Sequence, residues 1–150
     1  MYRIIGFIIL IFFFSGCMTV KVQKYLEDKA PYQKKFYAAY DKTLATTREA
    51  LQEMGWRISE TANPSVFEQS QATAEDKQIL LFTEVRQTPF IFSSRYSHLN
   101  VYIKFAGDNT TDVEIRYLAV TPMIFKNSKN YKNNDAVNKI FKRISQLLEQ

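Results

Sequence analysis

The sequence predicts an α+β fold in two layers, in which an antiparallel sheet of about five strands has an N-terminal and a C-terminal helix on one face. Two stretches have apolar residues at helical spacing, and the stretches between them alternate apolar and polar residues as half-buried strands do. Amphipathic helices and a half-buried sheet each need a partner surface, and both helices packed on one face provide it. The predicted order is α-β-β-β-β-β-α over residues 32–150.

The first helix is predicted over residues 32–54. Its apolar positions recur at intervals of four and three residues, which places them on one stripe of an amphipathic helix. Gly55 follows the stripe and is expected to end the helix, because glycine readily adopts the left-handed conformation found after helix C-termini. The stripe consists of Phe36, Tyr40, Leu44, Thr47, Leu51 and Met54.

Strands are predicted at residues 56–61, 66–73, 78–88, 97–106 and 111–120, with turn-forming residues between them. The last three alternate most regularly and are typical of antiparallel strands with one buried face. The positions expected to face the core are Ile79, Leu81, Thr83 and Val85, then Leu99, Val101, Ile103 and Phe105, and finally Val113, Ile115, Tyr117 and Ala119. Asn100, Tyr102, Lys104, Glu114 and Arg116 are expected on the outer face.

A last helix is predicted from about residue 135 to the end of the chain. Asn134 or Asp135 is expected to cap it, since short polar side chains accept hydrogen bonds from the first free amides of a helix. Its apolar stripe is formed by Val137, Ile140, Phe141, Ile144, Leu147 and Leu148.

The first 17 residues have the pattern of an export signal. Arg3 and the amino terminus are positive, residues 4–14 are apolar apart from Gly6, and the small residues Ser15 and Gly16 precede Cys17. A basic head, a 7–15-residue apolar stretch and a small-residue exit are typical of a secretory signal peptide. We therefore expect residues 1–16 to be removed.

The run Phe14-Ser15-Gly16-Cys17 resembles the lipobox of bacterial lipoproteins, although Phe14 departs from the leucine that is commonest at its position. The resemblance implies lipidation of Cys17, with a diacylglycerol on the thiol and often an acyl chain on the new amino group. Two or three chains are needed for stable anchoring. Cys17 is the only cysteine, so no intramolecular disulfide can form. The alternative is an uncleaved membrane span, but residues 4–20 are short and interrupted for one.

The same resemblance predicts a place in the cell envelope. Met18 follows the cysteine where an aspartate commonly retains Gram-negative lipoproteins at the inner membrane, so we expect the outer membrane, facing the periplasm. Residues 17–31 are then the lipidated cysteine and a tether. They are mixed and polar without a clear period. The domain can therefore stand off the bilayer, or Tyr25 and Leu26 can dock onto the domain.

Composition gives little support for catalysis. Without residues 1–16 the chain keeps 19 Lys and Arg against 15 Asp and Glu, a net charge of +4, from which no nucleic-acid partner follows. The single histidine, His98, cannot form a multi-histidine metal site, and we expect it at the surface or a strand edge. The sequence has neither a glycine-rich phosphate loop nor a Gly-x-Ser-x-Gly elbow. We expect no cofactor, no metal and no enzyme activity.

A second resemblance covers residues 50–58, Ala-Leu-Gln-Glu-Met-Gly-Trp-Arg-Ile, together with the element order. This combination is similar to small envelope lipoproteins such as the lipoprotein C subunit of the outer-membrane β-barrel assembly machinery. It implies a non-enzymatic module that binds an envelope protein, and it transfers no functional residue.

Two segments share the pattern Thr-Pro-x-Ile-Phe, at residues 88–92 and 121–125, and each follows a predicted strand. If the last three strands form a meander, both segments lie at the same end of the sheet. They either plug the core or form an exposed patch rimmed by basic residues, which would contact a partner or a membrane. The patch would comprise Phe90, Ile91, Phe92, Met123, Ile124 and Phe125.

These observations rank three functions. First is a membrane-anchored envelope lipoprotein that acts as a non-enzymatic binding or assembly-accessory module. Second is a carrier of a small apolar ligand or lipid in a cavity between helices and sheet. Third is an envelope hydrolase, which would need a cleft lined by carboxylates or His98.

Overall fold

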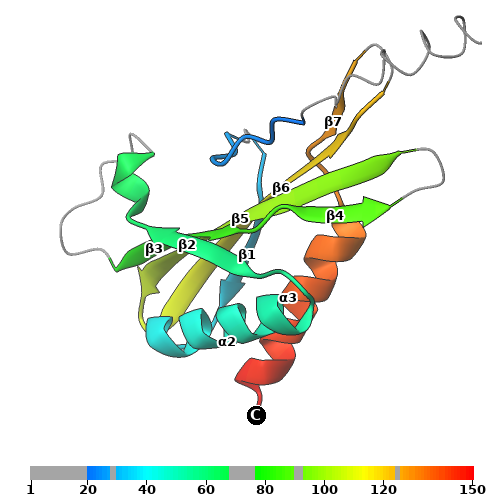
Figure 1. The fold of residues 1–150 in the computed structure, drawn as a ribbon. Coiled ribbons are helices and arrows are strands. Elements are labelled where there is room, and N and C mark those ends of the chain that lie inside the picture. The colour runs from blue at the N-terminus through cyan, green and yellow to red at the C-terminus, as the bar shows by residue number, and fades with distance from the viewer. Residues whose placement is uncertain (1–19, 28–29, 68–76, 90–92, 124–125) are drawn as a thin grey trace, which may run out of the picture.

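A computed structural model describes residues 20–27, 30–67, 77–89, 93–123 and 126–150 (Figure 1). It confirms an α+β fold with an antiparallel sheet and two helices, but the described sheet has seven strands and the chain enters it with a strand. The predicted element order is therefore wrong at its start. The elements are β1 (Tyr32–Phe36), α2 (Tyr40–Glu53), β2 (Ile58–Ala62), the 3-10 helix η1 (Pro64–Val66), β3 (Gln78–Thr83), β4 (Arg86–Pro89), β5 (Ser94–Gly107), β6 (Thr110–Thr121), β7 (Ser128–Asn130) and α3 (Asn134–Leu148).

The long hairpin of β5 and β6 forms the centre of the sheet. The strand order is β1-β6-β5-β3-β2, while β4 pairs with the start of β5 and β7 with the end of β6. All of these pairs are antiparallel. Because β3 and β6 both flank β5, they run in the same direction, as the predicted meander requires.

The core lies between the sheet and the two helices, which cover the same face (Figure 1). The predicted alternation is confirmed for most inward positions, and the predicted stripe of α3 is buried there as well. Val85 and Phe105 are exceptions, because both are exposed. The buried inward residues include Leu81, Leu99, Val101, Ile103, Val113, Ile115, Tyr117 and Ala119, with Val137, Ile140, Phe141, Ile144 and Leu147 from α3.

The predicted first helix is wrong over residues 32–36, which form β1. Tyr32 and Phe36 are four residues apart, a spacing that puts them on one side of either a helix or a strand. Pairing with β6 decides the outcome, since Tyr32 lies opposite Ile115 and Phe36 opposite Thr111. The helix therefore begins at Tyr40.

The C-terminus of α2 and the N-terminus of α3 have specific caps. At the end of α2, the Gly55 amide bonds the Gln52 carbonyl and the Trp56 amide bonds the Leu51 carbonyl at 2.8 Å, which is a Schellman motif. Gly55 has φ +76°, as predicted from its position after the stripe. The N-cap of α3 is Asn133, one residue before the predicted cap, and its Oδ1 accepts from the Ala136 amide at 3.1 Å.

The predicted strand 78–88 is divided into β3 and β4 by a bulge. From Phe82 to Arg86 the chain advances four residues, while its partner advances three, from Asn100 to Ser97. At the bulge the Thr83 hydroxyl accepts from the Leu99 amide at 2.8 Å, which satisfies a buried donor. The predicted strand 66–73 is not confirmed: Val66 belongs to η1, and residues 68–73 lie outside the described part.

The outer face of the sheet, opposite the helices, is also covered. Residues 20–27, which we call the N-terminal segment, lie across it (Figure 1), and Leu26 is only 1% exposed. Of the two alternatives for the tether, the structure has the docked one for this stretch. The sheet is therefore covered on both faces near its middle, which the two-layer prediction did not include.

Candidate functional site: the N-terminal segment and the hairpin end

Asn100 holds the N-terminal segment to the centre of the sheet. Its Oδ1 accepts from the Leu26 amide at 2.6 Å, and its Nδ2 donates to the Lys24 carbonyl at 3.0 Å. Both bonds form at a side chain that is fully buried. A buried polar group that loses its partner costs about 1–3 kcal/mol. Release of the segment would remove both partners of the buried Asn100 side chain, so these two bonds favour the docked segment.

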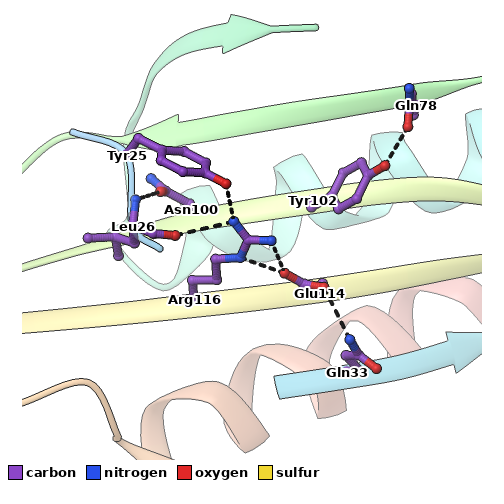
Figure 2. Close-up of polar contacts among 8 residues, drawn as sticks. All are labelled: Tyr25, Leu26, Gln33, Gln78, Asn100, Tyr102, Glu114 and Arg116. Atoms are coloured by element: carbon purple, nitrogen blue, oxygen red, sulfur yellow. Dashed lines mark hydrogen bonds and ion pairs between the residues drawn. The ribbon is translucent and has the colours of Figure 1, made fainter. Parts of the chain in front are cut away.

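Arg116 provides the second attachment and links three elements (Figure 2). Its Nη1 donates to the Tyr25 hydroxyl at 2.8 Å and to the Leu26 carbonyl at 3.2 Å, while Nε and Nη2 each lie 2.5 Å from Glu114 Oε1. Glu114 in turn accepts from Gln33 of β1 at 3.1 Å. Arg116 is 8% exposed, and removing one member of a buried ion pair typically costs about 3–5 kcal/mol.

Aromatic contacts on the same outer face extend this attachment toward β3 and β2, at the other edge of the sheet. The ring of Tyr25 stacks on Phe67 with 5.2 Å between centroids, and Phe67 packs edge-on against Phe82 of β3. Lys24 lies over the Phe82 ring and pairs with Glu60 of β2 at 2.5 Å. The N-terminal segment thus contacts residues from β2, β3, β5 and β6.

The N-terminal segment runs along β5 in the direction of that strand. The backbone of Gln23 hydrogen-bonds to His98, and three residues later Leu26 bonds Asn100. The residues before Gln23 therefore lie toward the start of β5.

The start of the segment packs beside the end of β6. Val20 and Val22 contact a small apolar cluster on the outer face, and Val120 of that cluster lies opposite Tyr96, near the end of β6 and the start of β5. In Figure 1 the segment accordingly begins close to β7. The buried members of the cluster are Leu26, Leu118 and Val120.

The β4–β5 and β6–β7 hairpins lie near the start of the N-terminal segment. Pro89 of β4 lies opposite Ser94 of β5, and Thr121 of β6 lies opposite Ser128 of β7. Because Tyr96 and Val120 are partners, the two hairpins lie side by side at one end of the sheet. We call this the hairpin end, made up of residues 87–89, 93–96, 120–123 and 126–129.

The Thr-Pro dipeptides of both repeated motifs lie at the hairpin end, as predicted. Thr88 lies opposite Arg95 of β5, and Thr121 directly follows Val120, which lies opposite Tyr96. Met123 is 58% exposed. The other five residues of the predicted patch, Phe90, Ile91, Phe92, Ile124 and Phe125, lie outside the described residues, as do Cys17 and its lipobox.

The hairpin end is basic. The sequence contains no aspartate or glutamate between Val85 and His98 or between Tyr117 and Asn134. The cations at the hairpin end, all exposed, are Arg95, Lys126 and Lys129.

His98 is buried, contrary to the expectation of a surface or edge position. It lies in β5 opposite Leu118 and is 2% exposed, beneath the N-terminal segment. Burial lowers its pKa, while hydrogen bonds to the backbones of Gln23 and Thr83 act in the opposite direction. The expectation failed because it treated the outer face of the sheet as solvated, whereas the N-terminal segment covers it.

A groove of about 520 Å³ runs between β1 and α3, on the edge of the sheet. Tyr32 and Lys34 line one side and Phe141 and Lys142 the other, and Lys34 reaches across to Ser145 Oγ at 2.9 Å. Among the described strands β1 pairs only with β6, so alternate backbone groups along its other side are available to a further strand.

Sequence reasoning placed Asn100 and Arg116 in solvent and missed their role. A signal for it was present in two continuous apolar runs, residues 79–82 and 117–120. Such runs are typical of strands covered on both faces. Read in this way, they would have predicted that something covers Leu80 and Leu118.

Replacing Asn100 by leucine, which has the same branching and the same number of side-chain heavy atoms, should release the N-terminal segment. The Leu26 amide and the Lys24 carbonyl would lose their partners, so amide hydrogen exchange in residues 24–27 should accelerate while the β5–β6 ladder stays protected. The matched control is Asn138→Leu on the exposed side of α3, which should leave this exchange unchanged. Unaltered protection of the segment in Asn100→Leu would show that Asn100 does not hold it.

The lowered pKa of His98 predicts that stability falls as the pH is lowered below about 6.5. In that range His98 binds a proton in the unfolded chain but stays neutral in the folded chain. The free energy of unfolding therefore decreases as the pH falls, with a slope of at most about 1.4 kcal/mol per pH unit. Urea unfolding between pH 7.5 and 5.5 measures this. His98 is the only histidine, so His98→Gln should flatten the slope; equal slopes in both proteins would contradict the prediction.

Comparisons with protein-family models and with curated proteins found no match to the chain. Within the described residues, no three His, Cys, Asp or Glu are grouped closely enough to hold a metal ion, and no helix has the length and apolarity needed to cross a membrane.

Proposed function

We propose that this chain is a cell-envelope lipoprotein, attached through lipid on Cys17 to the outer membrane and facing the periplasm. Its domain acts as a non-enzymatic module that binds an envelope protein or assists assembly. Residues 1–16 are the signal peptide in this proposal, and Cys17 is the first residue of the mature protein.

The observation that carries this proposal is the docking of the N-terminal segment. The described body begins at Val20, three residues after Cys17, and three residues of chain span at most about 11 Å. A lipid on Cys17 would thus be held close to one defined end of the sheet. Such short attachment suits a module that works at a fixed position relative to the membrane.

Binding without catalysis is supported by the surroundings of the only histidine. His98 lies under the N-terminal segment, and it lines neither the groove between β1 and α3 nor the hairpin end. The groove instead offers an edge strand together with aromatic and basic side chains. An extended segment of a partner can pair with such an edge, and lysines on β1 disfavour indiscriminate pairing.

The interface between helices and sheet favours surface binding over an internal ligand. Leu51, Ile103, Ile115 and Ile144 are fully buried in one cluster there. That cluster occupies the space that a carrier would need for a small apolar ligand, which places the carrier function second.

The intact mass of the protein extracted from native membranes should equal that of residues 17–150 plus a diacylglyceryl group and an acyl chain. Cys17→Ser should give an unmodified full-length precursor, because the thiol is the acceptor of the lipid. We expect the domain to fold without the lipid, so the near-UV circular dichroism spectrum of the variant should match that of the wild type. A mass of 150 unmodified residues in the wild type would contradict the anchor.

A photo-crosslinking amino acid in place of Gln146, at the groove between β1 and α3, should yield a protein adduct in native membranes. The control position is Gln52, exposed on α2, where no matching adduct is expected. Mass spectrometry of the adducts identifies the partner. Only lipid adducts, or the same adducts at both positions, would contradict a binding site in this groove.

A further inference from the structure

We propose that the hairpin end rests on the lipid surface that holds Cys17, with Met123 in the headgroup region and the surrounding cations against anionic phosphates. This inference rests on the proposed lipid anchor and adds to it a fixed orientation of the domain. The sheet would then stand with its hairpin end toward the bilayer and its opposite end toward the aqueous space.

The path of the chain supplies the first step. The N-terminal segment enters beside the end of β6, where Val20 and Val22 contact the cluster that contains Val120. From Val20 back to Cys17 the chain can extend at most about 11 Å. A membrane that holds the lipid of Cys17 therefore lies within reach of the hairpin end.

The surface chemistry supplies the second step. Met123 exposes 58% of its surface at the tip of the β6–β7 hairpin. Arg95, Lys126 and Lys129 surround this end, and acidic residues are missing from both hairpin stretches of the sequence. An apolar side chain among cations matches the boundary between acyl chains and anionic headgroups.

The two prolines make this end suitable for contact with lipid. Pro89 is the last residue of β4, and Pro122 follows the last residue of β6. Neither has an amide hydrogen, so each strand ends there without adding a backbone donor that would need a partner in a poorly hydrated place.

The opposite end of the sheet has a different character. The β5–β6 turn there contains Asp108 and Asn109, both exposed and in the left-handed conformation, and Tyr37 is 86% exposed after β1. Phe36 lies opposite Thr111, near the β5–β6 turn, so Tyr37 is at the end of the sheet opposite the hairpin end. This position provides a matched exposed site for comparison with Met123.

The test uses the mature lipidated protein of residues 17–150, in which the thiol of Cys17 is blocked, so that an introduced cysteine is the only one to react. Met123→Cys and Tyr37→Cys are each labelled with the environment-sensitive fluorophore NBD. The proteins are reconstituted into phosphatidylethanolamine vesicles with phosphatidylglycerol and with lipids brominated near the headgroup. Bromine should quench the label at 123 several-fold more strongly than the label at 37.

A charge variant completes the test. Lys126→Glu with Lys129→Glu in the labelled Met123→Cys protein should reduce the quenching, and so should omission of phosphatidylglycerol. Equal quenching at 123 and 37 would overturn the proposal. The proposal would also be overturned if the NBD label at position 123 were shielded from water in native membranes but not in protein-free vesicles. That result would favour an acidic protein bound at this end.

The anchor is tested separately in the same samples. If neither labelled protein floats with the vesicles, the lipid on Cys17 is absent, and the proposed function fails together with the orientation that rests on it. If both float but position 123 remains in water, the anchor stands and the orientation alone is wrong.

Discussion

The burial of Arg116 is the constraint on which the outer half of this structure depends. A guanidinium on a strand can be withdrawn from water only when it has partners, and here Glu114, Tyr25 and Leu26 accept from its Nε, Nη1 and Nη2. Two of these partners belong to the N-terminal segment, some 90 residues away in the sequence. The segment therefore completes the sheet, because without it a charge and several apolar side chains would be exposed together.

This constraint explains why the strands look as they do. Leu80 and Phe82 on β3 and Leu118 and Val120 on β6 face away from the helices, and all four are buried. A sheet covered by helices alone would carry polar residues at these positions. The N-terminal segment packs on Leu118 and Val120, and Phe67 and Lys24 pack on Phe82. Asn100 and Arg116 fix the position of the segment.

The sequence was sufficient wherever local periodicity decides the structure. The alternation of β5 and β6 and the stripe of α3 identified the inner core, and the place of Gly55 identified the end of α2. It was insufficient where distant parts of the chain decide. Residues 32–36 become a strand because β6 is available to pair with them, and Asn100 is buried because of Leu26, 74 residues earlier. The prediction for His98 was wrong for the same reason, since the segment that covers it is distant in the sequence.

The geometry separates the two surfaces on which the proposed function relies. Along β6, the partners of β1 lie between Thr111 and Ile115, six to ten residues before the strand ends at Thr121. At about 3.4 Å per residue, this separates β1 from the hairpin end by roughly 20–35 Å. Contact of the hairpin end with a bilayer would leave the groove between β1 and α3 in the aqueous space, where a partner can reach it. One rigid sheet would thus couple a membrane contact at its end to a protein contact at its edge.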